Sequence, residues 1–294
     1  MKIRIPATSA NLGPGFDSLG LAIKLYNYVT IKPYTCQSIS IKGEGSKKPR
    51  LKVNNVFVSI FTEVYQELLG QKDNFRFEFE NNIPFSRGLG SSSAVIVGAI
   101  ASAYHMANIK VSKEKILNRA LVYENHPDNI APAVYGGFTT SIVDDGIVKS
   151  LKKELPKDIK AVMVIPDRAM STAQSRTQLP KSYYMSDVVY NSSRVGLMSA
   201  AFFSEDWEML KFVARDKMHE HRRMKKMKEL FEIRKIALQN GALMSTLSGS
   251  GSSFFSMTYE KDVQKLLKKL KESFESFRVE SFDFDNIGYK IIES

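Results

Sequence analysis

The sequence predicts a globular protein that contains both helices and strands, and three observations indicate this. Residues 75–80 alternate between apolar and polar side chains, as a half-buried strand does. Five apolar residues recur at the spacing of one helix face: Phe57, Ile60, Phe61, Val64 and Leu68. The chain has 294 residues, 43% of them hydrophobic and 25% charged, so it can bury the core of one large domain or of two ordinary ones.

The chain begins with a predicted strand and a long loop. Residues 2–5 alternate and predict a strand that ends at Pro6. The glycine-rich segment that follows, residues 7–20, contains Asp17 as its single ionisable side chain, and ordered loops of this kind are usually functional. Asn11 and Asp17 are also common turn-forming residues, so this alternative stays open.

Two further strands and a helix are predicted next. Residues 21–31 and 38–42 have strand patterns, and residues 43–52 are a polar connector. The helix with the apolar face described above is predicted to end at Gly70, because glycine is the usual residue just after a helix.

A glycine-serine loop follows the strand at 75–80. It comprises Pro84, Phe85, Ser86, Arg87, Gly88, Leu89, Gly90, Ser91, Ser92, Ser93 and Ala94. The serines are good N-cap residues, so a helix is predicted to begin among them and to continue past Ile100. A glycine turn that opens a helix leaves several amide groups pointing the same way, at the positive end of the helix dipole. This pattern predicts a phosphate site, although a tight turn before a core helix would share it.

Two common nucleotide-binding loops do not fit this segment. A P-loop would need Gly-Lys-Ser/Thr at a fixed spacing, which is missing here. A Rossmann turn would need a βαβ unit at the start of the chain and an acidic residue further on.

A polar cluster follows a helix predicted at residues 112–124. Glu124, His126, Asp128 and Asn129 supply polar groups within six residues, flanked by prolines and glycines. Glu124 is a candidate Mg²⁺ ligand, because Mg²⁺ bound with a nucleotide takes only one or two protein carboxylates. For His126 alone, a hydrogen-bonded structural role is favoured.

A polar stretch at residues 152–157 is a candidate domain boundary. A hairpin is predicted before it, with strands at 138–143 and 146–150. Residues 159–165, directly after the boundary, are strongly apolar and predict another strand.

A short helix that carries Arg176 is predicted next, capped by Ser171 or Thr172 and ended by Pro180. Further helices are predicted at residues 187–203, 205–214, 227–240 and 263–270. The basic run at 217–226 lacks the interleaved aromatic residues of an RNA-stacking platform. It therefore indicates a loop or helix end with one useful arginine.

A second glycine-serine segment, residues 247–253, lies between predicted strands at 243–247 and 254–259. Two such loops in one chain predict two walls of one anion pocket. Residues 277–284 and 289–292 are predicted to close the fold as strands.

Composition narrows the classes of partner. The net charge of +11 favours nucleic acid, a membrane surface or an anionic small molecule, but the lysines are spread along the chain beside glutamates, which indicates a solvated basic surface. The sequence contains no apolar run near the roughly 20 residues that span a bilayer and no signal-peptide pattern. The single cysteine, Cys36, excludes a disulfide framework and is typical of a cytoplasmic protein.

Three motifs occur in order along the chain. They are Pro-Ala-Thr-Ser-Ala-Asn-Leu-Gly-Pro-Gly-Phe-Asp at residues 6–17, Pro-Phe-Ser-Arg-Gly-Leu-Gly-Ser-Ser-Ser-Ala at 84–94, and Leu-Ser-Gly-Ser-Gly-Ser-Ser at 247–253. In these motifs the chain resembles the GHMP small-molecule kinases, and within them the homoserine kinases. The resemblance implies an α+β fold with a βαβ-type ATP-binding domain at 1–155 and a ferredoxin-like domain at 156–294. The active site would lie in the cleft between them.

The resemblance also implies roles for single residues. Residues 84–94 would wrap the phosphates of ATP, Asn55 would contact adenine, and Ser92 and Glu124 would hold Mg²⁺. The residues that would contact homoserine are Asn11, Asp17, Asn129, Arg176 and Arg223; of these, Asp17, Asn129 and Arg176 would be catalytic. Two alternatives stay open: Asp17 either orients the hydroxyl or takes its proton, and the second arginine is either Arg223 or Arg222.

The implied activity is ATP-dependent phosphorylation of the side-chain hydroxyl of L-homoserine, a cytoplasmic step of threonine biosynthesis. No nucleic-acid or membrane partner is expected, and a homodimer is left open. One alternative is a GHMP kinase of the mevalonate or shikimate type, but a substrate without an amine leaves Asn11 and Asp17 without a purpose. The other is a basic nucleic-acid-binding protein, which would explain neither glycine-serine loop.

Overall fold

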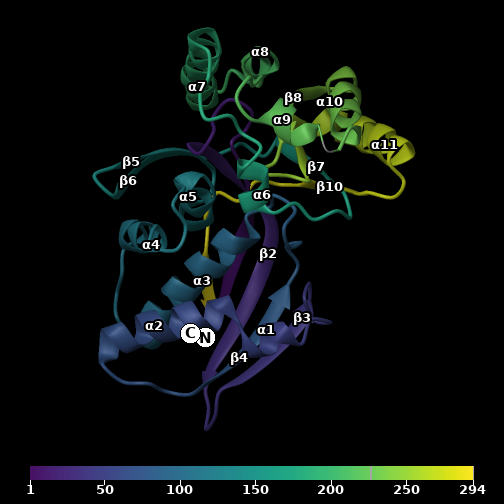
Figure 1. The fold of residues 1–294 in the computed structure, drawn as a ribbon. Helices are drawn as coiled ribbons and strands as arrows, with labels where there is room; N and C mark the ends of the chain where they lie inside the picture. The colour runs from purple at the N-terminus through teal and green to yellow at the C-terminus, as the bar shows by residue number, and fades with distance from the viewer. Residues whose placement is uncertain (226, 294) are drawn as a thin grey trace.

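Two β-sheets with helices packed on them organise the molecule, as Figure 1 shows. The computed structural model describes residues 1–225 and 227–293; Lys226, the last residue of the predicted basic run, lies outside the described residues. The predicted α+β fold is confirmed. Within the described ranges, the structure contains no helix that is long and apolar enough to cross a membrane.

The first sheet is built mainly from the N-terminal half of the chain. Its strands are β1 (Lys2–Ala10), β2 (Leu19–Pro33), β3 (Ser38–Gly43), β4 (Phe75–Asn81), β5 (Phe138–Asp144), β6 (Ile147–Lys153) and β11 (Lys290–Glu293). They lie in the order β11-β1-β2-β4-β3, and β5 joins the sheet beside β2 and carries β6. The strands and the hairpin predicted in this half are confirmed.

Helices cover one face of this sheet. They are α1 (Arg50–Val53), α2 (Val56–Leu69), α3 (Ser91–Met106), α4 (Lys113–Ala120) and α5 (Pro127–Tyr135). The apolar stripe of α2 packs on β4, where the Phe57 ring meets the rings of Phe77 and Phe79 edge-on at centroid distances of 6.3 and 5.3 Å. Gly70 ends α2 in the left-handed conformation, at φ 72°, as predicted.

The first strand is longer than predicted. Pro6 does not end β1, which continues to Ala10, so the loop begins at Asn11. The pairing of β1 with β2 shifts in register between Pro6 and Ala7. Proline lacks an amide donor, and such an irregularity is where a strand can accommodate it. The continuation is buried, and it carries Thr8 and Ser9 into the interior beside the glycine-serine loops.

Several predicted helix boundaries are wrong. The helix predicted to reach Glu124 ends at Ala120. Residues 127–135 form α5, which was not predicted because Pro132 inside it and the polar residues at its start are typical of turns. α3 does begin at Ser91, but its N-cap is the left-handed Gly90 and not a serine. The segment predicted as one helix at 205–214 is a 3-10 turn, Trp207–Met209, followed by α8 (Leu210–Val213).

The second sheet contains β7 (Ile159–Ile165), β8 (Ala242–Leu247), β9 (Phe254–Tyr259) and β10 (Arg278–Phe282). Their spatial order is β10-β7-β9-β8, and every pair is antiparallel. With helices after β7 and after β9, this is the βαββαβ order of a ferredoxin-like domain. Its core joins β7 to α10 (Glu229–Gln239) and α11 (Val263–Ser273) through residues such as Val162, Leu230 and Leu266.

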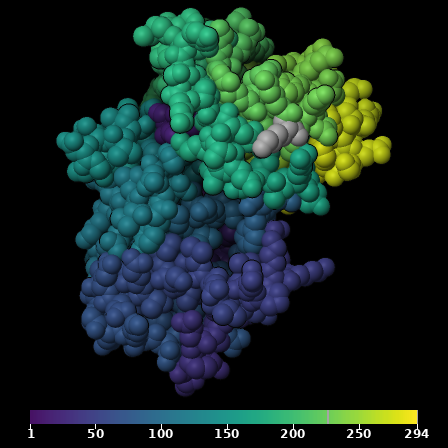
Figure 2. Space-filling view, in the orientation of Figure 1, coloured from purple at the N-terminus to yellow at the C-terminus, as the bar shows by residue number. Residues whose placement is uncertain are grey.

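The chain returns to the first sheet at its C-terminal end. β11 pairs with β1, and Phe284 bridges Ile23 of β2; Figure 1 accordingly draws the two ends of the chain side by side. The first sheet therefore contains strands from both ends of the chain, and a single division near residue 155 stays a prediction. Figure 2 shows a hollow between the part built on the first sheet and the part built on the second.

Candidate active site

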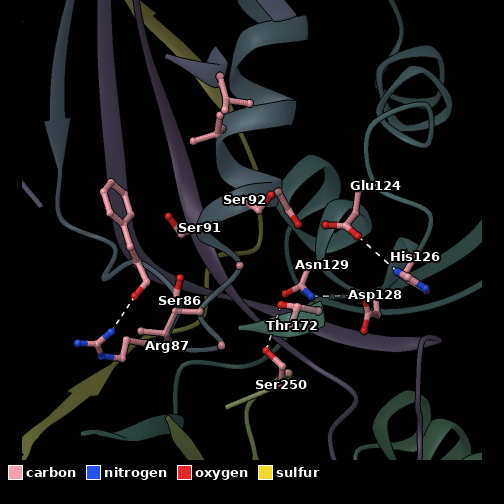
Figure 3. Close-up of a pocket in the computed structure, with 18 of the residues that line it drawn as sticks. Ser86, Arg87, Ser91, Ser92, Glu124, His126, Asp128, Asn129, Thr172 and Ser250 are labelled. Carbon is pink, nitrogen blue, oxygen red and sulfur yellow. Dashed lines mark hydrogen bonds and ion pairs between the residues drawn. The ribbon is translucent and has the colours of Figure 1, made fainter. Parts of the chain in front are cut away.

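A cavity of about 470 Å³ lies where the two parts of the molecule meet, and it gathers most of the predicted site residues. From the first glycine-serine loop, residues 85–93 line it, whereas Pro84 and Ala94 do not. The other predicted residues that line it are Asn11, Asp17, Asn55, Glu124, Asn129, Arg176 and Arg223. Figure 3 shows the loop and the polar cluster facing one another across this space.

The two glycine-serine loops lie against each other, as predicted. Ser248 Oγ donates to the carbonyl oxygen of Gly88 at 2.6 Å, and Ser253 N donates to that of Arg87 at 3.0 Å. Gly88 has φ +72°, and a Cβ there would lie 2.0 Å from the carbonyl oxygen of Ser248. Only glycine allows this close approach. Gly249 lines the same cavity, so the second loop forms part of its wall.

The N-terminus of α3 opens toward this cavity. Gly90 caps the helix in the left-handed conformation, and Ser91, Ser92 and Ser93 line the cavity directly after it. The first amide groups of a helix have no partner within it, and the helix dipole places partial positive charge there. The first turn of α3 is therefore a site for an anion such as a phosphate group.

An ion pair joins the loop between β1 and β2 to the part of the molecule built on the second sheet. Arg176, at the end of α6 (Thr172–Arg176), donates from both terminal nitrogens to Asp17, at 3.0 and 2.8 Å. Asp17 N donates in turn to Asn11 Oδ1 at 3.0 Å, and Asn11 Nδ2 donates to the carbonyl oxygen of Gly249 at 3.0 Å. These contacts hold Asn11, Asp17 and Arg176, three of the five predicted substrate residues, in one cluster.

The direction of Arg176 is fixed by its short helix. Ser171 caps α6 through its hydroxyl, as predicted. Thr172 Oγ1 lies 3.2 Å from Ser250 Oγ, and Ser175 Oγ donates to the carbonyl oxygen of Ser250 at 3.3 Å. Figure 3 shows the contact between Thr172 and Ser250. The helix is thus tied to the second glycine-serine loop.

The structure distinguishes the two candidate arginines of the basic run. Arg223, in α9 (Glu220–Met224), is 2% exposed and lines the cavity, whereas Arg222 is exposed and does not. Arg223 donates to the carbonyl oxygen of Gly249 at 3.1 Å, and burial lowers its pKa. The ring of Phe16 lies close to both guanidinium groups, with its centroid 5.1 Å from Arg176 and 5.2 Å from Arg223. Sequence reasoning gave Phe16 no role, because only the fold brings it near two cations.

The polar cluster beside α3 centres on Glu124 and His126. His126 Nδ1 lies 3.4 Å from Glu124 Oε1, and His126 Nε2 lies 3.7 Å from Asp17 Oδ2. The hydrogen bond to Glu124 raises the pKa of His126, against the opposing effect of burial. Ser92 and Glu124 line one cavity, and Figure 3 shows Glu124 pointing toward the first turn of α3.

Asn55 lines the cavity together with several apolar residues. It is the N-cap of α2: its Oδ1 accepts from Val58 N at 3.2 Å, and its Nδ2 donates to the carbonyl oxygen of Leu51 at 3.1 Å. The cavity wall here also includes Val56, Phe79 and Phe85. Flat apolar walls of this kind suit a planar aromatic group.

Asp128 is a buried carboxyl group that sequence reasoning placed only near the site. It is 5% exposed. Its pKa is influenced by the charges of four nearby groups, which are Asp17, Glu124, His126 and Arg176. Burial, and after it the charge of Asp17, raises the pKa of Asp128 to about 7. The neutral form is therefore favoured in the folded protein below about pH 7.

This raised pKa predicts how Asp128 affects stability. Between about pH 4 and pH 7 the unfolded chain ionises Asp128 while the folded protein does not, so its contribution to the free energy of unfolding falls as pH rises. We expect Asp128→Asn to raise the melting temperature relative to the wild type more at pH 8 than at pH 4.5. Thermal unfolding at both pH values measures this; an equal effect at both would contradict the raised pKa.

Comparisons with known proteins agree with this geometry. Residues 55–137 match the GHMP kinases N terminal domain, and residues 198–276 match the GHMP kinases C terminal domain. The chain is 60% identical to a homoserine kinase of a Nitratiruptor species over 293 residues, which cover 100% of both chains. It is 58% identical to a homoserine kinase of Campylobacter concisus, again over 100% of both.

Solved structures have the same fold. The crystal structure of a homoserine kinase from Cytophaga hutchinsonii superposes with a TM-score of 0.88 and 27% identity, covering 99% of this chain and 97% of that one. The mevalonate kinase of Methanococcus jannaschii superposes with a TM-score of 0.73 at 17% identity, covering 97% and 98%, which shows a shared fold alone. The chain belongs to the GHMP kinase family and, within it, to the homoserine kinases.

Proposed function

We propose that the protein transfers the γ-phosphoryl group of ATP to the side-chain hydroxyl of L-homoserine, giving O-phospho-L-homoserine for threonine biosynthesis. One observation carries the choice of substrate: Arg176 pairs with Asp17, and Arg223 lines the same cavity. Homoserine carries an α-carboxylate and an α-amine, which need arginine and acid partners respectively. The full-length similarity to homoserine kinases supports the same substrate.

The chain's residues would act mainly by positioning and by charge. The hydroxyl oxygen of homoserine forms a bond to the γ-phosphorus as the bond to the β,γ-bridging oxygen breaks; ADP leaves, and the hydroxyl proton passes to water. Amides at the start of α3 would stabilise the phosphoryl oxygens. Both carboxylate oxygens of Asp17 accept from Arg176, which supports an orienting role for Asp17 rather than a role as base.

Ser92 and Glu124 are proposed to hold Mg²⁺ with the nucleotide. A hydroxyl and one carboxylate fit the oxygen ligands that Mg²⁺ prefers when phosphates complete its shell. Among residues 1–225 and 227–293 there is no group of three or more His, Cys, Asp and Glu side chains that could hold a metal alone. When bound, the ion would neutralise charge on the phosphates.

Removal of either ligand should weaken the binding of Mg²⁺ to the enzyme. We expect Ser92→Ala and Glu124→Gln each to raise the Mg²⁺ concentration at half-maximal rate by about tenfold, because each removes an oxygen ligand or its charge. Ser91→Ala, one residue away in the same cavity wall, is the matched control and should change it little. An unchanged Mg²⁺ dependence in Glu124→Gln would move the metal role to another acid, first of all Asp128.

A substrate panel tests the proposed function directly. ADP release should be fastest with L-homoserine and much slower with mevalonate and shikimate, whose carboxylates come without an amine. The structural similarity to mevalonate kinase concerns the fold alone, since the identity is 17%. Faster turnover with mevalonate or shikimate would overturn the proposal.

We also propose that the enzyme is a cytoplasmic homodimer. The single cysteine, Cys36, is free and exposed, as is usual in a reducing compartment. Helix α7 (Met185–Ser204) exposes Met185, Val189, Leu197 and Phe203, and exposed apolar patches commonly mark protein contacts. Light scattering should give a mass of about twice 33.1 kDa; a mass of one chain at micromolar concentration would exclude the dimer.

A further inference from the structure

We propose that Thr8 is a positioning residue for phosphoryl transfer: its hydroxyl fixes the side-chain amide of Asn129 so that an N–H remains free for the acceptor site. The inference rests on the proposed function and extends it to a residue that does not line the cavity. Thr8 lies in β1, is fully buried and does not line the cavity, so it would act through Asn129.

Thr8 connects the phosphate-binding loop to the start of α5. Its backbone N–H donates to the carbonyl oxygen of Leu89 at 3.2 Å, and its Oγ1 donates to Asn129 Oδ1 at 2.7 Å. The same hydroxyl lies where a Cβ on Gly90 would be, 1.8 Å from the ideal position. One buried threonine thus sets the distance between Gly90 and Asn129.

The two partners of Asn129 determine which way its amide points. Asn129 Oδ1 accepts from Thr8, and Asn129 Nδ2 donates to Asp128 Oδ1 at 3.3 Å; Figure 3 shows the second contact. The reversed amide would place two acceptor oxygens together at Asp128 whenever that carboxyl is ionised. An amide nitrogen carries two hydrogens, so one N–H of Asn129 remains after the bond to Asp128.

This orientation limits the chemistry of Asn129. A group that presents an N–H toward the acceptor site can stabilise the attacking hydroxyl oxygen or a phosphoryl oxygen, and it cannot accept the hydroxyl proton. Asn129 lines the cavity beside the start of α3, where charge develops on the transferred group. Fixed donors at such a place contribute to the rate because they need no reorganisation during the reaction.

The experiment compares Thr8→Val, which removes the hydroxyl, with Thr8→Ser, which retains it. We expect Thr8→Val to lower kcat for homoserine by about three- to tenfold, the usual effect of one hydrogen bond, with the KM for ATP within about twofold. Thr8→Ser should recover most of the rate. Thr258→Val is the matched control, because Thr258 is also a buried strand threonine, donating to the carbonyl oxygen of Gly241 at 2.8 Å away from the cavity; it should leave kcat unchanged.

A double-mutant cycle shows whether Thr8 acts through Asn129. In an Asn129→Ala background, Thr8→Val should cost no further activity. An equal loss in both backgrounds, a raised KM for ATP at unchanged kcat, or a kcat for Thr8→Val equal to that of Thr258→Val would overturn the inference. These outcomes are separate from a failure of the proposed function, which would appear as poor turnover of homoserine by the wild type.

Discussion

Gly90→Ala should lower kcat/KM by about 10² to 10³-fold, the loss expected when a group that stabilises the transferring phosphoryl is displaced. The added Cβ would lie 1.8 Å from Thr8 Oγ1 and 3.1 Å from Asn129 Oδ1. Neither neighbour can move freely, because Thr8 is held in β1 and Asn129 in α5. The loop must therefore shift, and the amides at the start of α3 shift with it. Steady-state kinetics with ATP and homoserine measures the loss.

The effect of backbone strain in Gly90→Ala must be distinguished from the effect of this steric clash. Gly90 has φ +65°, so alanine there is strained whatever the space. Gly70 offers a matched control: it has φ +72° at the end of α2, and a Cβ there would have no neighbour within 4 Å. Gly70→Ala should lower the free energy of unfolding by about 1 kcal/mol and leave kcat/KM unchanged. A folded Gly90→Ala variant with near-normal turnover would exclude this loop as the phosphate site.

Local sequence patterns predicted the parts of the fold that depend on interactions between residues close together in the sequence. The period of α2, the glycine at its end and the alternation in β4 depend on neighbours within a few residues. The course of β1 through Pro6 depends instead on pairing with β2, which the segment itself does not encode. The same holds for α5, whose sequence is rich in residues typical of turns and which packs against both the first sheet and α3.

The candidate site was predictable as a set of residues and unpredictable as a set of contacts. The motifs brought Asp17 and Arg176 into one hypothesis, yet their ion pair joins residues 159 positions apart. Burial separates Arg223 from Arg222, and the pattern of a basic run contains no such distinction. Thr8 stood within the first motif without a role, because its partner Asn129 is 121 residues away.

Arg176→Met should lower kcat/KM for homoserine by about one to two powers of ten, since hydrogen bonds from a charged group are worth about 1.5–3 kcal/mol each. The guanidinium of Arg176 spans Asp17 in this structure. On binding, the α-carboxylate of homoserine would share that guanidinium, and the α-amine would then face Asp17. The wild type should therefore turn over 3-aminopropan-1-ol, which is homoserine without its carboxylate, about as poorly as the variant turns over homoserine.

The decisive comparison is whether the loss from the mutation and the loss from the missing carboxylate are independent of each other. If both report one contact, Arg176→Met should cost little further with 3-aminopropan-1-ol, as in a double-mutant cycle between directly coupled groups. Losses that multiply would show that Arg176 does not face the carboxylate. Arg223, whose Nε has no hydrogen-bond partner among the described residues, would then be the better candidate, and Arg223→Met should show the coupling instead. Arg222→Met is the control for that pair, because the exposed Arg222 lies outside the cavity wall and should leave kcat/KM for both substrates unchanged.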